Sequence, residues 1–542
     1  SEMCIRDRSI LYSGRLFNKN KERSEVRTLE EVLLSEIEGF KELGHKFLSG
    51  EVSKMDFKGA SGGMGVYAHR NKTDFMIRFR IPSGIAQEKA LRFIYDYAEK
   101  YGADTIHLTT RQAIQLHGIS IDQVCEVMEA GIKNGIYSRG AGGNFPRNVA
   151  ISPLSGVEKG EAFDVSPYAL AIGDYFLQRI YTYKLPRKLK VAFSNSAKDQ
   201  PHAGAVDLGF VAMREGEKEY FKVYIAGGMG RNARLGVEFP EPVEPEDVLY
   251  HVEAATQLFI SEGDYQNKNK ARMRYIVERM GAEAFLSCYR EHLKKAKESQ
   301  ELKLSVCKEQ YTKSGSKTEI SSSRLTEQKQ EGLYSVYVHP VGGQLPLADL
   351  KMILDETSKI KDSQIRLAMT EGLYIRNLDG KEAEDLLEKT AHIGGDTCLE
   401  QSVACIGVPI CQMGLLDSQE TLREVIRYFK EKDFKEDVLP EIHISGCTNS
   451  CSAHQIGKIG FCGKRVQVQG EAKDAFELHL GGRLGAGSAK LADSCGDILR
   501  KDVPSFLYDV ALSLSRYKKD FNSWMQENDL ELKEILKNYI LN

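Results

Sequence analysis

The pattern of apolar and polar positions divides the chain into two halves that repeat each other. From Phe75 to Gly118 it predicts an apolar strand, a Pro-Ser-Gly turn, a helix and a second strand, His107 to Gly118 (HLTTRQAIQLHG). Tyr334 to Asn377 predicts the same order, and later matches keep a shift of about 254 to 259 residues. A shared order at a near-constant shift indicates a duplicated module. We therefore expect a pseudo-two-fold molecule with a site between its halves, rather than two similar domains that are merely tethered.

The segments outside the repeat are more polar. Lys294 to Gln330 is rich in Lys, Glu, Ser and Gln, which predicts the end of a helix and then a solvated linker. Residues 9–60 are a polar extension with one helical stretch near Leu29 to Phe47, and Val503 to Leu541 is helical by periodicity. Ser1 to Arg8 have no apolar stretch behind them, so they form no signal-peptide pattern, and we leave them out of the fold prediction.

Composition narrows the class of protein. The 542 residues are 42% hydrophobic and 28% charged, which is typical of a soluble globular chain of roughly three or four domains. The chain contains no apolar run of about 18 residues, the length that would predict a membrane span. The net charge of −3 argues against a nucleic-acid partner, so any anion site must be a local cluster of Lys and Arg. Without a secretion signal, we expect a reducing, cytoplasmic compartment.

Four of the eleven cysteines are closely spaced, as Cys405-x5-Cys411 and Cys447-x3-Cys451. Four thiolates suit either Zn²⁺ or a 4Fe-4S cluster. Structural zinc sites favour pairs two to four residues apart, so a spacing of five in a Gly-Val-Pro loop fits zinc less well. The Gly-rich surroundings offer free backbone amides, which a buried cluster needs around its sulfurs. Zinc and uncommitted thiols remain the alternatives.

Basic and polar residues are concentrated in the first half. If HLTTRQAIQLHG is one strand, its odd-numbered polar residues share a face, which would suit a polyanionic ligand. A solvated strand face is the alternative. Lys188 and Lys190 alternate across Leu189 and point the same way if that segment is extended. The candidate residues are Arg78 in IRFRIPSG, Thr109, Arg111, Gln115 and His117 in LTTRQAIQLHG, Arg147 in NFPRN, and Arg187, Lys188 and Lys190 in LPRKLK.

Together, the two cysteine pairs and the motifs TTRQAIQLHG, NFPRNVAISPLSG and LPRKLK resemble the siroheme-containing nitrite/sulfite reductase family, from about Phe75 to the end of the chain. The resemblance implies an internally duplicated α+β fold with two ferredoxin-like half-domains and two α/β siroheme/cluster domains related by a pseudo-two-fold. The implied domains are an N-terminal extension (1–60), a first half-domain (61–135), a siroheme/substrate domain (136–295), a linker (296–330), a second half-domain (331–397) and a 4Fe-4S cluster/siroheme domain (398–542).

The resemblance also implies roles for the candidate residues. Cys405, Cys411, Cys447 and Cys451 would hold a 4Fe-4S cluster, with Cys451 also bridging to the siroheme iron. Arg78, Arg147, Lys188 and Lys190 would surround the anion, and Thr109, Arg111, Gln115, His117 and Arg187 would bind siroheme. The chain departs from the family pattern at His107, where some relatives have Arg, and at Glu371, where an amide is common.

The resulting functional prediction is a monomeric, siroheme- and 4Fe-4S-dependent enzyme that reduces sulfite to sulfide by six electrons. No flavin or nicotinamide fingerprint is found, so electrons should come from ferredoxin or a similar small donor. Among relatives, sulfite-type enzymes resemble the Lys-x-Lys of Lys188 to Lys190, whereas nitrite-type enzymes tend to place Asn second; reduction of nitrite to ammonia is the alternative. A non-catalytic iron–sulfur electron-transfer protein would keep the cysteines but would not need the four cations.

Overall fold

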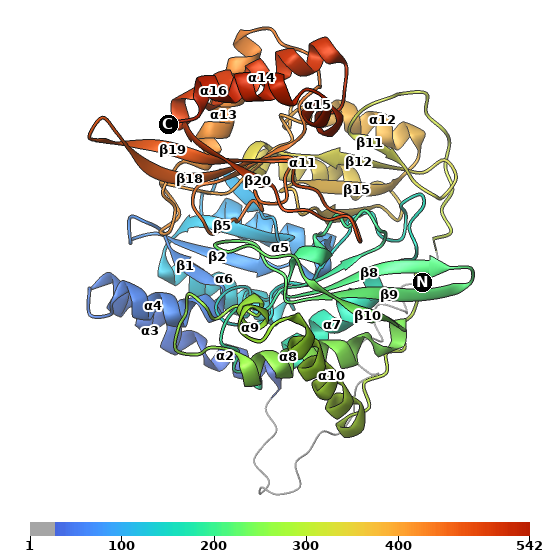
Figure 1. Ribbon diagram of the computed structural model, residues 1–542. Helices are drawn as coiled ribbons and strands as arrows, with labels where there is room; N and C mark the ends of the chain where they lie inside the picture. The colour runs from blue at the N-terminus through green and yellow to red at the C-terminus, as the bar shows by residue number, and fades with distance from the viewer. Residues whose placement is uncertain (1–27, 310, 542) are drawn as a thin grey trace, which may run out of the picture.

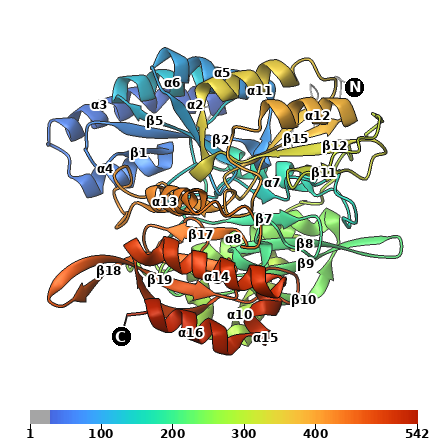
Figure 2. The same ribbon diagram turned by 90° about the horizontal axis from the view of Figure 1, so that it is seen from above.

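The computed structural model describes residues 28–309 and 311–541, so the excluded segment Ser1 to Arg8 lies outside it. In this described part the strands form four five-stranded sheets (Figure 1). Two sheets belong to ferredoxin-like modules and two to α/β modules. Seen from above, the blue and yellow modules lie on one side of the molecule and the green and red modules on the other (Figure 2).

The first ferredoxin-like module packs helices against one face of its sheet. In β2, Phe75, Ile77 and Phe79 are buried in the hydrophobic core, while Arg78 points to the opposite face. A Ser120–Gln123 capping box begins α6. The elements are α2 (Leu29–Ser35), α3 (Ile37–Leu48), α4 (Lys54–Ser61), β1 (Val66–Ala68), β2 (Phe75–Arg80), α5 (Glu88–Lys100), β4 (Thr105–Leu108), β5 (Ala113–Ile119) and α6 (Ile121–Lys133). Thus α2 and α3 occupy the expected helical stretch of the N-terminal extension.

The second ferredoxin-like module repeats this order. Its helix α12 begins with an Asp379–Glu382 capping box, at the place of Ser120–Gln123 in the first module. Between α10 (Ala282–Ser299) of the first half and β11 the described chain has no helix or strand, and β11 itself lies within the segment 296–330 predicted as a linker. The elements are β11 (Leu325–Glu327), β12 (Tyr334–Val338), α11 (Leu347–Thr357), β14 (Gln364–Leu367), β15 (Leu373–Leu378) and α12 (Gly380–Lys389).

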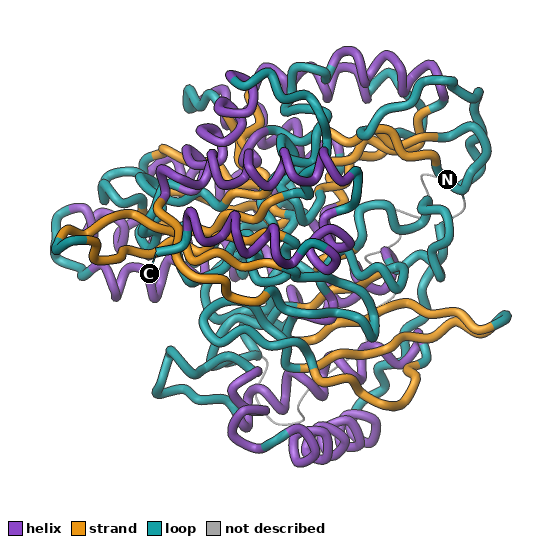
Figure 3. The backbone as a smooth tube through the Cα atoms, turned by 45° about the horizontal axis from the view of Figure 1, so that its top comes forward, coloured by secondary structure: helices purple, strands orange, loops and turns teal. Residues whose placement is uncertain are grey.

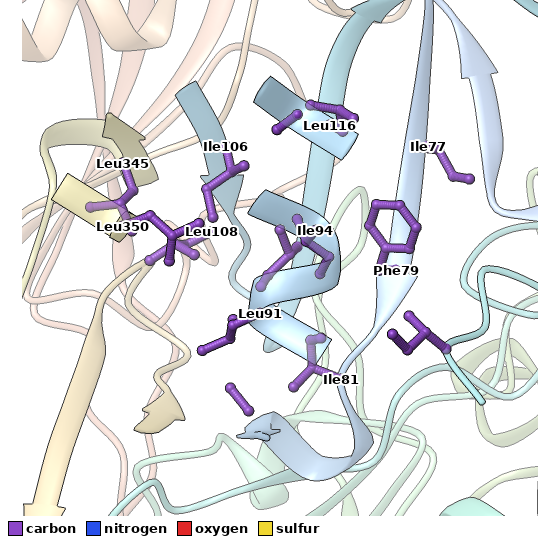
Figure 4. Packing of buried hydrophobic residues seen from close by; sticks show 14 of the residues in the cluster. Ile77, Phe79, Ile81, Leu91, Ile94, Ile106, Leu108, Leu116, Leu345 and Leu350 are labelled. Atoms are coloured by element: carbon purple, nitrogen blue, oxygen red, sulfur yellow. The ribbon is translucent and has the colours of Figure 1, made fainter. Parts of the chain in front are cut away.

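Each ferredoxin-like sheet is completed by a strand from the other half. β13 (Gln344–Pro346) pairs with β4 of the first module, and β3 (Ile85–Ala86) pairs with β14 of the second. Leu345 and Leu350 of the second half therefore pack beside Ile106 and Leu108 of the first in one continuous core (Figure 4). This exchange of strands makes the halves interdependent, which excludes the alternative of two tethered domains.

The two α/β modules share a second common topology. In each, three parallel strands continue into two antiparallel ones, and the long hairpins β8–β9 and β18–β19 project from opposite sides of the molecule (Figures 1 and 3). The first contains β6 (Ala150–Ile151), α7 (Ser166–Gln178), β7 (Val191–Ser194), β8 (Leu208–Glu215), β9 (Lys218–Ile225), β10 (Val237–Val243), α8 (Val248–Glu262), α9 (Arg274–Met280) and α10 (Ala282–Ser299). The second contains β16 (Val403–Ala404), α13 (Ser418–Glu431), β17 (Ile442–Ser445), β18 (Ile459–Val468), β19 (Glu471–Leu480), β20 (Asp493–Leu499), α14 (Val503–Tyr517), α15 (Phe521–Glu527) and α16 (Asp529–Tyr539).

The prediction of one continuous strand from His107 to Gly118 is wrong. β4 ends at Leu108, and β5 runs back antiparallel to it with His107 opposite Gln115. The intervening turn contains Gln112 at a φ of 52° and lacks the Gly, Pro or Asn that usually marks such a turn. Thr109 and Arg111 therefore lie in the turn and do not share a strand face with Gln115 and His117.

The shift between the copies lies within the predicted 254 to 259 residues in the ferredoxin-like modules but not in the α/β modules. In the ferredoxin-like modules Gln112 corresponds to Glu371, which has a φ of 66°, giving a shift of 259. In the α/β modules the ladder pair Val191–Leu208 corresponds to Ile442–Ile459, giving a shift of 251. The match by sequence alone had therefore aligned the strands of the two α/β modules out of register with the structure.

Among the helices of the described residues, none has the length and apolar character needed to cross a bilayer.

Candidate active site

The four predicted anion-binding cations converge from three segments of the first half. Arg78 lies on β2, opposite Gln115 on β5. Arg147 lies in a segment that runs beside Lys188 to Lys190: its backbone N–H donates to the carbonyl of Leu189 (2.8 Å), and the N–H of Leu189 donates to Phe145 (3.2 Å). Residues 188–190 are therefore extended, which is the condition under which Lys188 and Lys190 point the same way. In addition to burial, the charges of Lys190 and Arg147 lower the pKa of Lys188, and the charge of Arg78 lowers the pKa of Arg147.

The two lysines are unusually acidic ammonium groups. Burial, followed by the nearby charges of Lys190 and Arg272, lowers the pKa of Lys188 well below its usual value. Burial, with Arg111 and Arg272, lowers the pKa of Lys190 to about 7. An ammonium group with a lowered pKa gives up its proton more readily, so both can act as proton donors to an anion.

Gln115 connects Arg78 to two histidines. Its side-chain oxygen accepts from Arg78 (2.5 and 2.8 Å), and its nitrogen donates to Nδ1 of His107 (2.7 Å) and to Nε2 of His117 (3.1 Å). Nδ1 of His117 in turn lies 3.1 Å from Nε2 of His69. Burial lowers the pKa of His107 to about 4 and that of His117 well below its usual value, so both imidazoles are neutral near pH 7.

The other predicted siroheme residues lie around these groups. Arg111, in the β4–β5 turn, donates to the carbonyl of Val191 (2.6 Å). The hydroxyl of Thr109 accepts from the backbone N–H of Ala113 (3.1 Å), so it also stabilises this turn. Arg187 lies at the edge, where burial and the charge of Arg272 lower its pKa. The structure thus brings all nine basic and polar candidates to one region. Thr109 and Arg111 lie there in a turn and not on the predicted strand.

The site has a surplus of buried positive charge. Asp207 makes a bidentate ion pair with Arg272 (3.0 and 2.9 Å) and also accepts from the backbone N–H of Lys190 (2.8 Å). Buried N–H groups without a partner remain on Arg111 (Nε), Arg147 (Nη1) and Arg274 (Nε and Nη1). Buried cationic donors without acceptors are costly unless a ligand satisfies them. The donor set therefore fits a polycarboxylate such as siroheme together with a small anion.

The four grouped cysteines lie in two loops of the second α/β module, after β16 and after β17. Backbone N–H groups approach their sulfurs: Gly446 donates to Cys405 (3.2 Å) and Met413 to Cys411 (3.4 Å). Such contacts are typical of cluster ligands. Cys451 lies near enough to Cys405, Cys411 and Cys447 to interact with them electrostatically.

The spacing of these cysteines along the chain favours a cluster over a single zinc ion. The pair Cys405-x5-Cys411 is wider than the two to four residues usual in structural zinc sites. A 4Fe-4S cluster is held by four cysteine thiolates.

Cys451 is the cysteine that faces the cations of the first half. Burial raises the pKa of its thiol, but Lys188, Lys190 and Arg78 act in the opposite direction. The hydroxyl of Thr110, in the β4–β5 turn, donates to the carbonyl of Cys451 (2.8 Å). The thiol cluster and the cation cluster therefore meet at Cys451, at the junction of the two halves. Cys462 is buried nearby, and burial raises its thiol pKa to about 12.

Sequence reasoning missed Tyr67 and Asp207. The hydroxyl of Tyr67 accepts from the N–H of Gly143 (3.1 Å). Burial alone would raise its pKa, but the charges of Arg147 and Arg78 outweigh burial and lower it. A single tyrosine in a short strand such as β1 is usually a core residue, so the sequence alone gives no sign of a role for Tyr67 in the site. Its position beside Arg147 and Arg78 in the structure indicates that role.

Comparisons with known proteins agree with this fold. The nitrite and sulphite reductase 4Fe-4S domain family matches residues 142–297, and the nitrite/sulfite reductase ferredoxin-like half domain matches residues 67–132. The chloroplastic ferredoxin–nitrite reductase of Zea mays is 27% identical over 454 residues, 80% of this chain and 77% of that protein. The sulfite reductase [ferredoxin] 1 of Mycolicibacterium paratuberculosis is 26% identical, covering 80% and 81%. The solved NirA protein of Mycobacterium tuberculosis superposes with a TM-score of 0.76 at 22% identity, covering 93% and 97%.

The fold and the site define an internally duplicated iron–sulfur oxidoreductase. The chain belongs to the siroheme-containing nitrite/sulfite reductase family, and its cofactors are siroheme and a 4Fe-4S cluster. The two matched segments lie in the first half and contain Arg78, Arg147, Lys188 and Lys190. The four cysteines lie outside them.

We expect the anaerobically purified protein to contain roughly four cluster irons and one haem iron, with acid-labile sulfide. Cys411→Ser should lower the sulfide and the non-haem iron, because it removes one of four cluster thiolates. Cys462→Ser is the matched control and should leave both unchanged. Elemental analysis and sulfide determination check this, and a colourless protein with stoichiometric zinc would contradict it.

Proposed function

We propose that this enzyme reduces sulfite to sulfide, with ferredoxin as the electron donor. The observation that carries the choice of anion is Lys190, whose ammonium form adds a fourth cation beside Arg78, Arg147 and Lys188; a bound anion favours this form over the neutral amine. Sulfite near neutral pH is partly a dianion, whereas nitrite is a monoanion. A further positive charge in a water-poor pocket therefore favours sulfite by Coulomb attraction.

We assign siroheme to the donors that lack partners. Arg111, with Thr109, Gln115, His117 and Arg187 around it, would hold the siroheme carboxylates, and Arg274 adds two further unpaired N–H groups. Cys405, Cys411, Cys447 and Cys451 would hold the cluster, and Cys451 is the one whose thiol pKa burial raises but the charges of Lys188, Lys190 and Arg78 lower. When bound, the two cofactors supply single electrons in succession to the anion.

The side chains of the chain supply charge and protons. Arg78 and Arg147 orient the oxyanion, because guanidinium groups bind anion oxygens in fixed geometry. Each oxygen that leaves as water takes up two protons. Lys188 and Lys190 can give protons at this point because their pKa values are lowered. Tyr67, whose pKa is lowered by Arg147 and Arg78, is a third donor within the same group.

Nitrite reduction to ammonia is the second candidate, and the names of the relatives favour it. Those of Zea mays and Leptolyngbya laminosa are ferredoxin–nitrite reductases, while that of Mycolicibacterium paratuberculosis is a sulfite reductase. All three names include ferredoxin, which supports ferredoxin as the donor here. The identities of 25–27% do not separate the two anions.

The variant Lys190→Asn should distinguish sulfite from nitrite as the preferred substrate. We expect kcat/KM for sulfite to fall by the equivalent of about 1–3 kcal/mol, as for a lost charged hydrogen bond, while kcat/KM for nitrite is unchanged or rises. Steady-state kinetics with both anions and one reduced ferredoxin measure this. Lys218→Asn, in an exposed ion pair on the β8–β9 hairpin, is the control. Equal losses for both anions would count against Lys190 as the determinant.

A further inference from the structure

One buried amide joins the two halves at the β4–β5 turn. The nitrogen of Gln112 donates to the carbonyl of Leu367 in β14 (2.7 Å) and to that of Ile151 in β6 (2.9 Å). Its oxygen accepts from the N–H of Ile151 (2.9 Å). Gln112 is fully buried. A single side chain, acting as donor and acceptor, thus links the turn to the other half and to the adjoining α/β sheet.

The duplication places Glu371 where the second half needs the same link. Glu371 is 2% exposed, and its Oε2 accepts from the N–H of Ala404 (3.0 Å), the counterpart of Ile151. Leu108, the last residue of β4, is the counterpart of Leu367. A Cβ on Gly343 would lie 3.1 Å from Cβ of Glu371 and 2.4 Å from the carbonyl oxygen of Leu108, so both flank the same point. Gln112 flanks the equivalent Gly84 in the first half.

An ionised carboxylate cannot make this link. It has no hydrogen to donate, and the oxygen that replaces the nitrogen of Gln112 would face carbonyl oxygens. A protonated carboxylic acid can donate as the amide does. We propose that Glu371 is held as a neutral carboxylic acid whose O–H donates across the interface to the carbonyl oxygen of Leu108, so that it positions strand β16 against the first half. This proposal is independent of which anion the enzyme reduces.

The surroundings support the neutral form. Burial raises the pKa of Glu371 to about 8, and the N–H of Ala404 offsets this only in part. Three titratable side chains of the described residues lie around it. Glu371 raises the pKa of Tyr337 on β12, His107 on β4 flanks the same point at Gly343, and Nε2 of His339 donates to the carbonyl of Thr370, the residue before Glu371 (2.7 Å). Burial lowers the pKa of both histidines to about 4 and raises that of Tyr337, so all three are neutral near pH 7. In the described residues, no charged side chain contributes to the pKa of Glu371.

The direction of the pH effect follows from these pKa values. The unfolded chain loses the Glu371 proton near pH 4.5, whereas the folded protein keeps it until pH is about 8. Between these limits the folded state binds more protons, so the free energy of unfolding falls as pH rises and levels off above about 8. Glu371→Gln carries the amide of the first half and should remove this slope.

Infrared spectroscopy of the holoenzyme tests the proton directly. The spectrum of the unaltered protein minus that of Glu371→Gln should show the carbonyl band of a protonated carboxylic acid at pH 6, and this band should disappear with a midpoint near pH 8. Glu42→Gln, at an exposed ion-paired carboxylate, should show no such band. Absence of the band at pH 6 in the Glu371 difference spectrum would overturn the proposal.

The dependence of the melting temperature on pH provides the second measurement. From pH 5 to 8 the melting temperature of the unaltered protein should fall relative to that of Glu371→Gln. The reciprocal variant, Gln112→Glu, should fall more steeply than the unaltered protein, because it then carries a buried acid in both copies. Parallel curves for the unaltered protein and Glu371→Gln would contradict the proposal, even if Gln112→Glu does not fold.

Discussion

Cys451→Ser is expected to abolish six-electron reduction, lowering turnover with reduced ferredoxin by at least about 10³-fold, as when a reactive group is removed outright. Cys451 is the cysteine whose thiol lies near Lys188, Lys190 and Arg78. A serine there would separate the electron source from the anion while leaving the cation cluster in place.

The control for this variant is Cys462→Ser, because Cys462 is buried in the same module but lies outside the loops of the four ligands. It should retain turnover. In Cys451→Ser, electron paramagnetic resonance should also show haem and cluster signals that are no longer magnetically coupled. Normal turnover in Cys451→Ser would refute its assignment as the shared ligand.

Lys188→Met is expected to lower kcat/KM for the preferred anion by about 10²–10³-fold, the usual effect of removing one preorganised charge from a reacting oxyanion. The variant removes both a positive charge and a proton donor, and methionine retains most of the volume. Lys184→Met, an exposed position in the same segment, is the matched control and should leave kcat/KM unchanged.

Steady-state kinetics check this prediction, with siroheme content measured in the same preparations. A loss smaller than tenfold at full siroheme occupancy would show that Lys188 does not contact the anion. If the loss follows siroheme content, Lys188 binds the cofactor instead.

The sequence was informative where the signal is local. The sequence of a strand, a turn and a helix in both halves follows from short-range patterns, and the structure confirms it, although each predicted second strand is in fact two strands, β4–β5 and β14–β15. The four cysteines stood out by spacing, and the structure places them in neighbouring loops. Their assignment as cluster ligands rests on their contacts and on the family.

The remaining features depend on contacts between distant segments. The β4–β5 turn has no glycine or proline, so the apolar pattern predicted a single strand across it. The short strands β3 and β13 have no sequence pattern that predicts their pairing with the sheet of the other half. Tyr67 and Asp207 gain their importance only from Arg147, Arg78 and Arg272, which lie far away in sequence. Glu371 was visible only as a departure from the family pattern; its meaning came from comparison with Gln112.

The central claim is tested most directly by the ratio of kcat/KM for sulfite to that for nitrite, measured on the unaltered holoenzyme with one reduced ferredoxin as donor. The fourth cation at Lys190 predicts a ratio above one, with sulfide as the product. A ratio far below one would contradict sulfite as the substrate and would identify the enzyme as a nitrite reductase.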